Sequence, residues 1–193
     1  MDTQEQQLPR RLSLQHKPNE SLHIVYRWFR EIHLFILFFS FLWNALLLFF
    51  YLNADSLSEA PVTFLIFPLL HLLTGLALFY YALAGIFNKT LVIARASHLS
   101  IRHRPFPWIG GRRIPRTKLA QLFVHESISH SSSGTLVTYQ VRALVAKRKQ
   151  AITLVRGLES PEQARFIERS IEDYLQIQDY PVSGEYPKEN TAT

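Results

Sequence analysis

The chain has 193 residues, a formal net charge of +6 at pH 7 and no cysteine. The absence of cysteine excludes disulfide bonds, thiolate metal sites and a cysteine nucleophile within this sequence. Apolar residues are concentrated between residues 33 and 87, and the rest of the chain is polar and basic. A basic balance is typical of proteins that bind nucleic acids, anionic lipids or acidic partners.

The chain begins with a segment that has no apolar run, residues 1–21, which predicts a polar N-terminal tail. Because this segment lacks the apolar core of a cleavable signal peptide, the first apolar segment is expected to stay in a membrane as a signal anchor. Residues 22–32 fit either a juxtamembrane strand or an interfacial helix, and their periodicity does not decide between the two.

Two apolar segments follow, residues 33–52 and residues 62–87, and neither contains Asp, Glu, Lys or Arg. About 20 helical residues at 1.5 Å each cover the roughly 30 Å hydrocarbon core of a bilayer. The sequence therefore predicts a transmembrane hairpin over residues 33–87, with a kink where Pro68 interrupts the second helix.

The charges beside the two segments predict the orientation of this hairpin. The link between the helices contains Asp55 and Glu59 but no Lys or Arg, whereas both outer flanks are rich in Lys and Arg. The positive-inside rule then predicts that both termini lie in the cytoplasm.

Polar residues within the two segments predict a cross-helix contact near the middle of the membrane. Asn44 falls at the same depth as His71 and Thr74 in an antiparallel hairpin, and Gly75 would allow close approach. We expect a hydrogen bond from Asn44 to His71 or Thr74 that staples the helices together. The alternative is a proton or substrate site at His71, because ionisable groups inside membranes are often functional.

After residue 88 the periodicity changes to that of strands. Residues 90–97, 99–103, 119–129, 136–146 and 151–155 predict five antiparallel strands, with a loop over residues 105–116. This pattern predicts a small β domain over residues 88–178.

A C-terminal helix is predicted over residues 161–177. Ser160 stands at the N-cap, Pro161 at the first position and Gln163 at the third, which is a capping-box arrangement. The apolar stripe of this helix should cover the sheet, with Glu168 and Glu172 largely in solvent. Residues 179–193 predict a loosely ordered polar tail.

The predicted strand order also suggests which residues face a membrane. A first strand that leaves the bilayer and a second that returns would bring the 105–116 loop back to the lipid. A third and a fourth strand would do the same for the 147–149 turn. These segments supply the predicted membrane-surface or lipid contacts, which are Trp108, Arg112, Arg113, Arg116, Lys147, Arg148 and Lys149. The alternative is that these charges only orient the domain.

The chain resembles a bacterial family of membrane proteins of unassigned activity, in which a transmembrane hairpin precedes a pleckstrin-homology-like domain. The matching segments are Tyr26–Trp28, Phe41–Trp43, His71–Gly75, Tyr80–Tyr81, Asn88–Thr90, Arg104–Trp108, Gln121–Phe123, Gln163–Glu168 and Gly184–Glu185. The resemblance implies an α+β membrane protein in a bacterial cytoplasmic membrane, or an equivalent internal membrane. It implies no activity.

Motifs of common enzyme classes are missing from the sequence, including HExxH, the P-loop and G-x-S-x-G. We therefore expect a non-enzymatic membrane-tethered adaptor without metal or cofactor, which binds a protein partner or anionic lipid and no nucleic acid. Alternatives are an assembly factor of a larger membrane complex, and a small membrane enzyme or transporter that uses His71. Homo-oligomerisation stays open.

Overall fold

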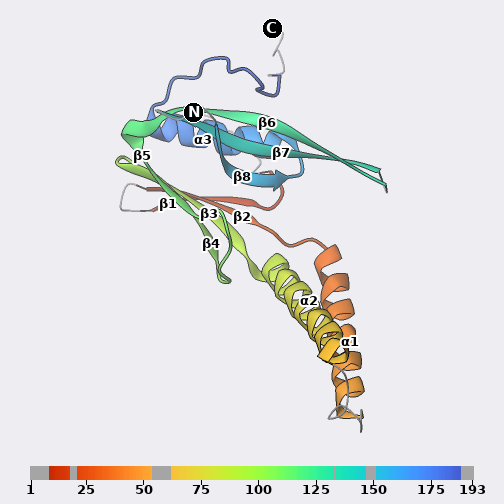
Figure 1. The fold of residues 1–193 in the computed structure, drawn as a ribbon. Helices are drawn as coiled ribbons and strands as arrows, with labels where there is room; N and C mark the ends of the chain where they lie inside the picture. Colours follow the sequence, from red (N-terminus) through yellow and green to blue (C-terminus); the bar gives the residue numbers. More distant parts are fainter. Residues whose placement is uncertain (1–8, 18–20, 54–61, 133, 147–150, 188–193) are drawn as a thin grey trace. The chain divides into compact units, whose positions relative to one another are not determined.

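The computed structural model describes residues 9–17, 21–53, 62–132, 134–146 and 151–187. These residues form three α-helices and two β-sheets, an α+β arrangement (Figure 1). The chain divides into two compact units. One is Arg27–Asn88, and the other combines Met1–Tyr26 with Lys89–Thr193.

The first unit is a hairpin of two helices, α1 (Ile32–Leu52) and α2 (Val62–Phe87), which pack side by side (Figure 1). The two predicted helices are thus confirmed as helices, and Pro68 lies inside α2. By length and composition both are able to cross a membrane.

The second unit, here called the β domain, contains a sheet drawn from both sides of the hairpin. Its strands are β1 (Leu12–Lys17), β2 (Ser21–Arg27), β3 (Lys89–Arg95), β4 (His98–Arg104) and β5 (Arg112–Pro115), adjacent in that order. The hairpin is therefore inserted in the sequence between two neighbouring strands, β2 and β3.

This sheet corrects the prediction of a polar tail over residues 1–21. Residues 12–17 form β1, which pairs antiparallel with β2 from Leu12 opposite Tyr26. The open choice for residues 22–32 is resolved for its first part, because Leu22, Ile24 and Tyr26 alternate into the core of the β domain as strand residues. Strand β5 was also not predicted, since four residues are too few to show an alternation.

The second sheet contains β6 (Leu119–Ser131), β7 (Gly134–Val145) and β8 (Ile152–Leu158) in sequence order. The strands predicted over these residues are confirmed. Leu122 and Val124 of β6 lie opposite Ala143 and Val141 of β7, and all four side chains are buried. This face of the sheet therefore belongs to the core.

Helix α3 (Pro161–Leu175) contacts all three strands of this sheet and also β3 (Figure 1). The predicted cap is confirmed, because Ser160 Oγ accepts a hydrogen bond from the Gln163 amide at 3.4 Å. Ile167 and Ile171 are fully buried, as the stripe predicted. Glu168 and Glu172 are buried as well, contrary to expectation, because the packed face of the helix is wider than its apolar stripe.

The chain after α3 is bound to β6 as far as Tyr186, which corrects the prediction of a loosely ordered tail there. The Tyr186 amide donates to the Val124 carbonyl at 2.8 Å, and Gln121 Nε2 donates to Asp179 Oδ1 at 3.0 Å. The Tyr186 ring meets that of Tyr139 edge-on, with centroids 5.1 Å apart.

Candidate anion-binding site

Strands β4 and β5 and the loop between them line a hollow of about 460 Å³ in the β domain. Its lining is rich in arginine and contains no acidic residue. We call it the basic hollow, and it is lined by Ser100, Ile101, Arg102, His103, Arg104, Pro107, Trp108, Gly111, Arg112 and Arg113.

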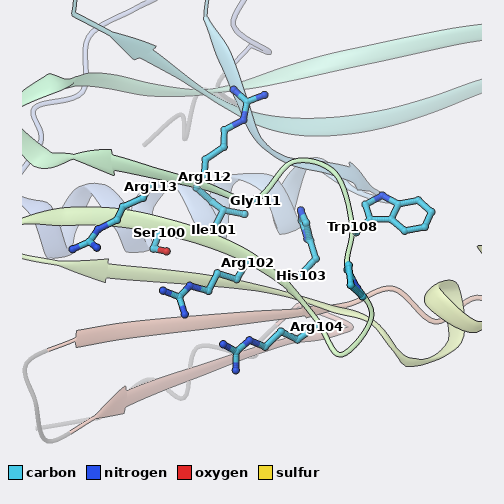
Figure 2. A pocket seen from close by; sticks show the side chains of 10 residues that line it. Ser100, Ile101, Arg102, His103, Arg104, Trp108, Gly111, Arg112 and Arg113 are labelled. Carbon is cyan, nitrogen blue, oxygen red and sulfur yellow. The ribbon is translucent and has the colours of Figure 1, made fainter.

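The register of β4 and β5 explains how the arginines are placed. Arg113 lies opposite Ser100, on the face of the sheet that also carries Arg102 and Arg104, whereas Arg112 lies opposite the core residue Ile101. Figure 2 shows Arg102 and Arg113 extending to one side while Arg112 points away from them. The guanidinium groups therefore lie on both faces of the β4–β5 pair, and the hollow that they line is open, which suits an exposed anionic group better than an enclosed small molecule.

The charge of this region is uncompensated along the chain. No Asp or Glu occurs between Glu59 and Glu126, although β3, β4 and β5 all carry Lys or Arg. Within the described residues a single salt bridge is found, between Arg11 and Glu159. Among these residues, Arg102, Arg104 and Arg112 therefore have no carboxylate partner. A cluster of one charge sign attracts anions and raises their local concentration.

Two histidines beside these arginines are held toward the neutral form. Burial, then the charges of Arg113, Arg95 and Arg102, lower the pKa of His98 below its ordinary value of 6.5. Burial and the charge of Arg156 lower the pKa of His103. Because an anion bound in the hollow would offset the positive charges around both rings, its binding should oppose these shifts.

The loop between β4 and β5 adds apolar surface beside the cationic groups. Trp108 is 38% exposed and Ile109 is 89% exposed. Figure 2 places the Trp108 ring beyond His103, at one end of the hollow. Indole rings are favoured in the headgroup layer of bilayers, so this combination fits an anionic membrane surface.

Three of the seven predicted lipid contacts, Trp108, Arg112 and Arg113, line this hollow together. Sequence reasoning missed Arg102 and Arg104, which were assigned to a strand and a flank. The alternation of β4 could have found them, since it puts both on the face opposite Ile101. Lys147, Arg148 and Lys149 lie outside the described residues.

Arg116 lies outside the lining of the basic hollow and has hydrogen bonds that were not predicted. Its guanidinium donates to the carbonyls of Leu175 at 3.0 Å and Gln176 at 3.2 Å, at the C-terminus of α3. Its amide donates to Ser97 O, at the end of β4 away from Arg104. The reason is β5, which carries the chain back along β4, so Arg116 caps a helix end with a favourable charge.

The polar residues of the predicted staple form hydrogen bonds other than the expected ones. Asn44 Nδ2 donates to Ser40 O at 2.6 Å, and Thr74 Oγ1 donates to Leu70 O at 2.8 Å, each within its own helix. The expected hydrogen bond from Asn44 to His71 or Thr74 is therefore wrong. Short side chains reach the carbonyl one turn back more easily than the neighbouring helix.

The contact between the helices is made instead by Trp43 and by glycines. Trp43 Nε1 donates to His71 O at 3.3 Å, and the Trp43 and His71 rings stack with centroids 5.7 Å apart. A Cβ on Gly75 would come within 2.8 Å of both amide atoms of Asn44. The predicted close approach at Gly75 is thus confirmed, and the ring contact favours a packing role for His71.

A second close contact, at His33 and Gly85, was not predicted. The His33 ring lies against the Gly85 backbone, where a Cβ would overlap the ring. His33 is buried, and its ring centroid is 5.7 Å from that of Tyr81. The glycine spacing of α2 was the available signal, since small residues mark helix contacts.

No group of three His, Cys, Asp or Glu side chains within the described residues could hold a metal ion. A scan against protein-family models finds no match, and a search of curated proteins finds no similar sequence. The resemblance to pleckstrin-homology-like membrane proteins therefore stays a prediction.

Proposed function

We propose that this chain is a non-enzymatic, membrane-anchored interaction protein that binds anionic lipid headgroups at the cytoplasmic leaflet. Its helical hairpin would be the anchor, and its β domain would act as a pleckstrin-homology-like module. The observation that carries the proposal is the basic hollow, where Arg102, Arg104, Arg112 and Arg113 occur together with no acidic residue.

The order of the chain supports a lipid ligand. Only Asn88 separates Phe87 of α2 from Lys89 of β3, and Lys89 lies opposite Arg104 in the β3–β4 register. Arg104 and the loop that follows it therefore lie at the end of the sheet where the chain leaves α2. Basic residues close to an anionic leaflet contribute about 1 kcal/mol each to binding.

The surface of the hairpin supports the anchor. Its exposed side chains include Phe35, Phe38, Leu46, Phe49 and Leu73, each more than half exposed. Such a surface is unfavourable in water and favourable in hydrocarbon.

The proposal can be tested with the full chain in lipid nanodiscs. Since the chain has no cysteine, Ile109→Cys gives a single labelling site at the loop of the basic hollow for an environment-sensitive fluorophore. We expect the label to be shielded from an aqueous quencher in discs of anionic phospholipid and accessible in zwitterionic discs. Added salt should reduce the difference.

A charge-matched pair of variants provides the control. Arg104→Gln/Arg112→Gln removes two charges from the hollow, and Lys118→Gln/Arg169→Gln removes two exposed charges elsewhere on the β domain. The first should weaken the response roughly thirtyfold and the second should leave it nearly unchanged. Equal effects, or equal shielding in both lipids, would overturn the proposal. Shielding by an added acidic peptide in zwitterionic discs would indicate a protein ligand instead.

A further inference from the structure

Strands β6 and β7 extend beyond β8 as a two-stranded ribbon (Figure 1). The β6–β7 pairing runs from Leu119 opposite Val145 to Ser131 opposite Gly134, whereas β8 pairs with β7 only between Tyr139 and Ala143. Among the residues that the structure describes, the outer part of the ribbon therefore has no strand paired along either edge. Free edges offer unpaired amide and carbonyl groups to another strand.

The outer ribbon carries apolar side chains that continue the core face of the sheet. Leu122 and Val124 of β6 are buried. Ile128 lies on the same face of the strand, two alternate positions further along, and is 52% exposed. Its cross-strand neighbour Val137 is 39% exposed. The face of the ribbon that packs in the core therefore continues as an exposed apolar face at Ile128 and Val137.

The outward-facing backbone groups of β6 can be assigned from its contact with the C-terminal segment. The Val124 carbonyl accepts from the Tyr186 amide at 2.8 Å, so Val124 presents its backbone groups away from β7. Alternation gives the same direction to Glu126, Ile128 and His130. Tyr186 covers the edge at Val124, and the next three outward positions lie beyond it.

The edge lacks the charges that usually protect such strands. Between Lys118 and Arg142 the sequence contains a single Asp, Glu, Lys or Arg, which is Glu126, although the chain as a whole has a net charge of +6. Native proteins block edge strands with lysine, proline or bulges. A second copy of a basic chain meets least repulsion at a surface without Lys or Arg.

We propose that the β6 edge pairs antiparallel with the β6 edge of a second copy of this chain. A two-fold axis at Ile128 makes the edge self-complementary, which is the requirement for a symmetric dimer. Ile128 of one copy then lies opposite Ile128 of the other. Glu126 of each copy lies opposite His130 of the other, so the Glu126 carboxylate can accept a hydrogen bond from the His130 ring. All three are outward positions, so they form the hydrogen-bonded pairs of the ladder.

This interface is small, so the dimer should be weak and depend on concentration. It does not depend on the ligand of the basic hollow, and it is tested separately from the proposed lipid binding.

The test uses single cysteines in the full chain, which has no cysteine of its own. Hydrogen-bonded pairs in antiparallel strands have Cα atoms about 5.5 Å apart, within the range of a disulfide. Ile128→Cys should therefore form disulfide-linked dimers under mild oxidation. Ser129→Cys is the matched control, because its register partner is Ser127 of the second copy and its own symmetry mate is too distant.

We expect at least about fivefold more disulfide with Ile128→Cys than with Ser129→Cys, because only the former meets its own symmetry mate at bonding distance. A mixture of Glu126→Cys and His130→Cys chains should cross-link to each other more than either does alone. Equal yields at positions 128 and 129, or no gain in the mixture, would overturn the proposal.

Ile128→Lys provides a second measurement that needs no cross-link. The side chain is exposed, so the β domain should fold as before, while the added charge should weaken self-association at least about tenfold. Analytical ultracentrifugation of the detergent-solubilised chain measures this change. Unchanged association would assign any dimer to another surface, such as the hairpin or the β7 edge, and would overturn the proposal. Shielding of a label at Ile128 by lipid without dimers would overturn it as well.

Discussion

The helical hairpin and the β domain expose opposite kinds of surface. In the hairpin, large apolar side chains such as Phe38 and Phe49 point outward, while Ser40 is buried and His33 is buried against Gly85. In the β domain, Leu122 and Ile167 are fully buried and the arginines of the basic hollow face solvent. The two units therefore differ in which kind of side chain they bury and which they expose.

The difference teaches what holds each unit together. The β domain has an apolar core, so water drives its folding. Apolar burial provides little driving force between helices in hydrocarbon, and close packing at small residues takes its place. The contacts at Gly75 and Gly85 are of this second kind, which supports the proposed membrane anchor.

The largest expected effect is the loss of a core side chain from the β domain. Ile167→Ala removes a fully buried side chain from the contact between α3 and the sheets, and it should lower the free energy of unfolding by about 2–5 kcal/mol. Chemical denaturation followed by circular dichroism measures this change. Ile109→Ala, at a position 89% exposed, should stay within about 0.5 kcal/mol of the wild type. Similar effects of the two would contradict the assigned core.

A smaller effect is expected at the helix contact of the hairpin. Gly85→Ala should destabilise the hairpin by about 1–3 kcal/mol, because the new Cβ overlaps the His33 ring. The sign of this stability change is informative, because alanine in a helix is otherwise about 1 kcal/mol more favourable than glycine. Unfolding in mixed detergent micelles measures it.

Two companion variants sharpen this test. Ala77→Leu adds more bulk at an exposed position of α2 and should be tolerated. His33→Ala removes the ring, so Gly85→Ala in that background should no longer be harmful. A destabilisation by Gly85→Ala that persists without the ring would count against the contact.

The smallest effect is a dependence of the β domain on pH. His98 and His103 have a pKa below the ordinary 6.5, so the unfolded chain binds protons more readily than the folded one. Their contribution to stability is thus present above about pH 6.5 and is lost as the pH falls through the folded values. We expect the free energy of unfolding to decrease from about pH 7 to about pH 5. The double variant His98→Asn/His103→Asn should show a flatter slope, and an equal slope would refute this account.

Local signals predicted the elements that repeat a clear pattern. The charge-free segments predicted α1 and α2, and Ser160, Pro161 and Gln163 predicted the start of α3. The long strands β6 and β7 alternate over many residues, so they were also predictable. Trp108, Arg112 and Arg113 were singled out from the predicted strand order together with residue type, and the structure places all three along the basic hollow.

Other features depend on contacts between distant parts of the chain. β1 was missed, and the choice between strand and helix for residues 22–32 stayed open, because the sequence places both segments before the hairpin while their sheet neighbours β3, β4 and β5 follow it. Arg116 looked like a free surface charge until the fold brought it to the end of α3. Arg102 and Arg104 joined the site only through the pairing of β4 with its neighbours.

The sequence by itself determined which segment is apolar and uncharged and which is polar and basic, because hydropathy and charge are summed over local segments. It determined the helices and long strands for the same reason. Only the tertiary structure decided that the N-terminal segment completes a sheet, that four arginines border one hollow, and that Trp43 and glycine join the helices. These outcomes depend on contacts between residues that are distant in the sequence, and local periodicity does not reveal such contacts.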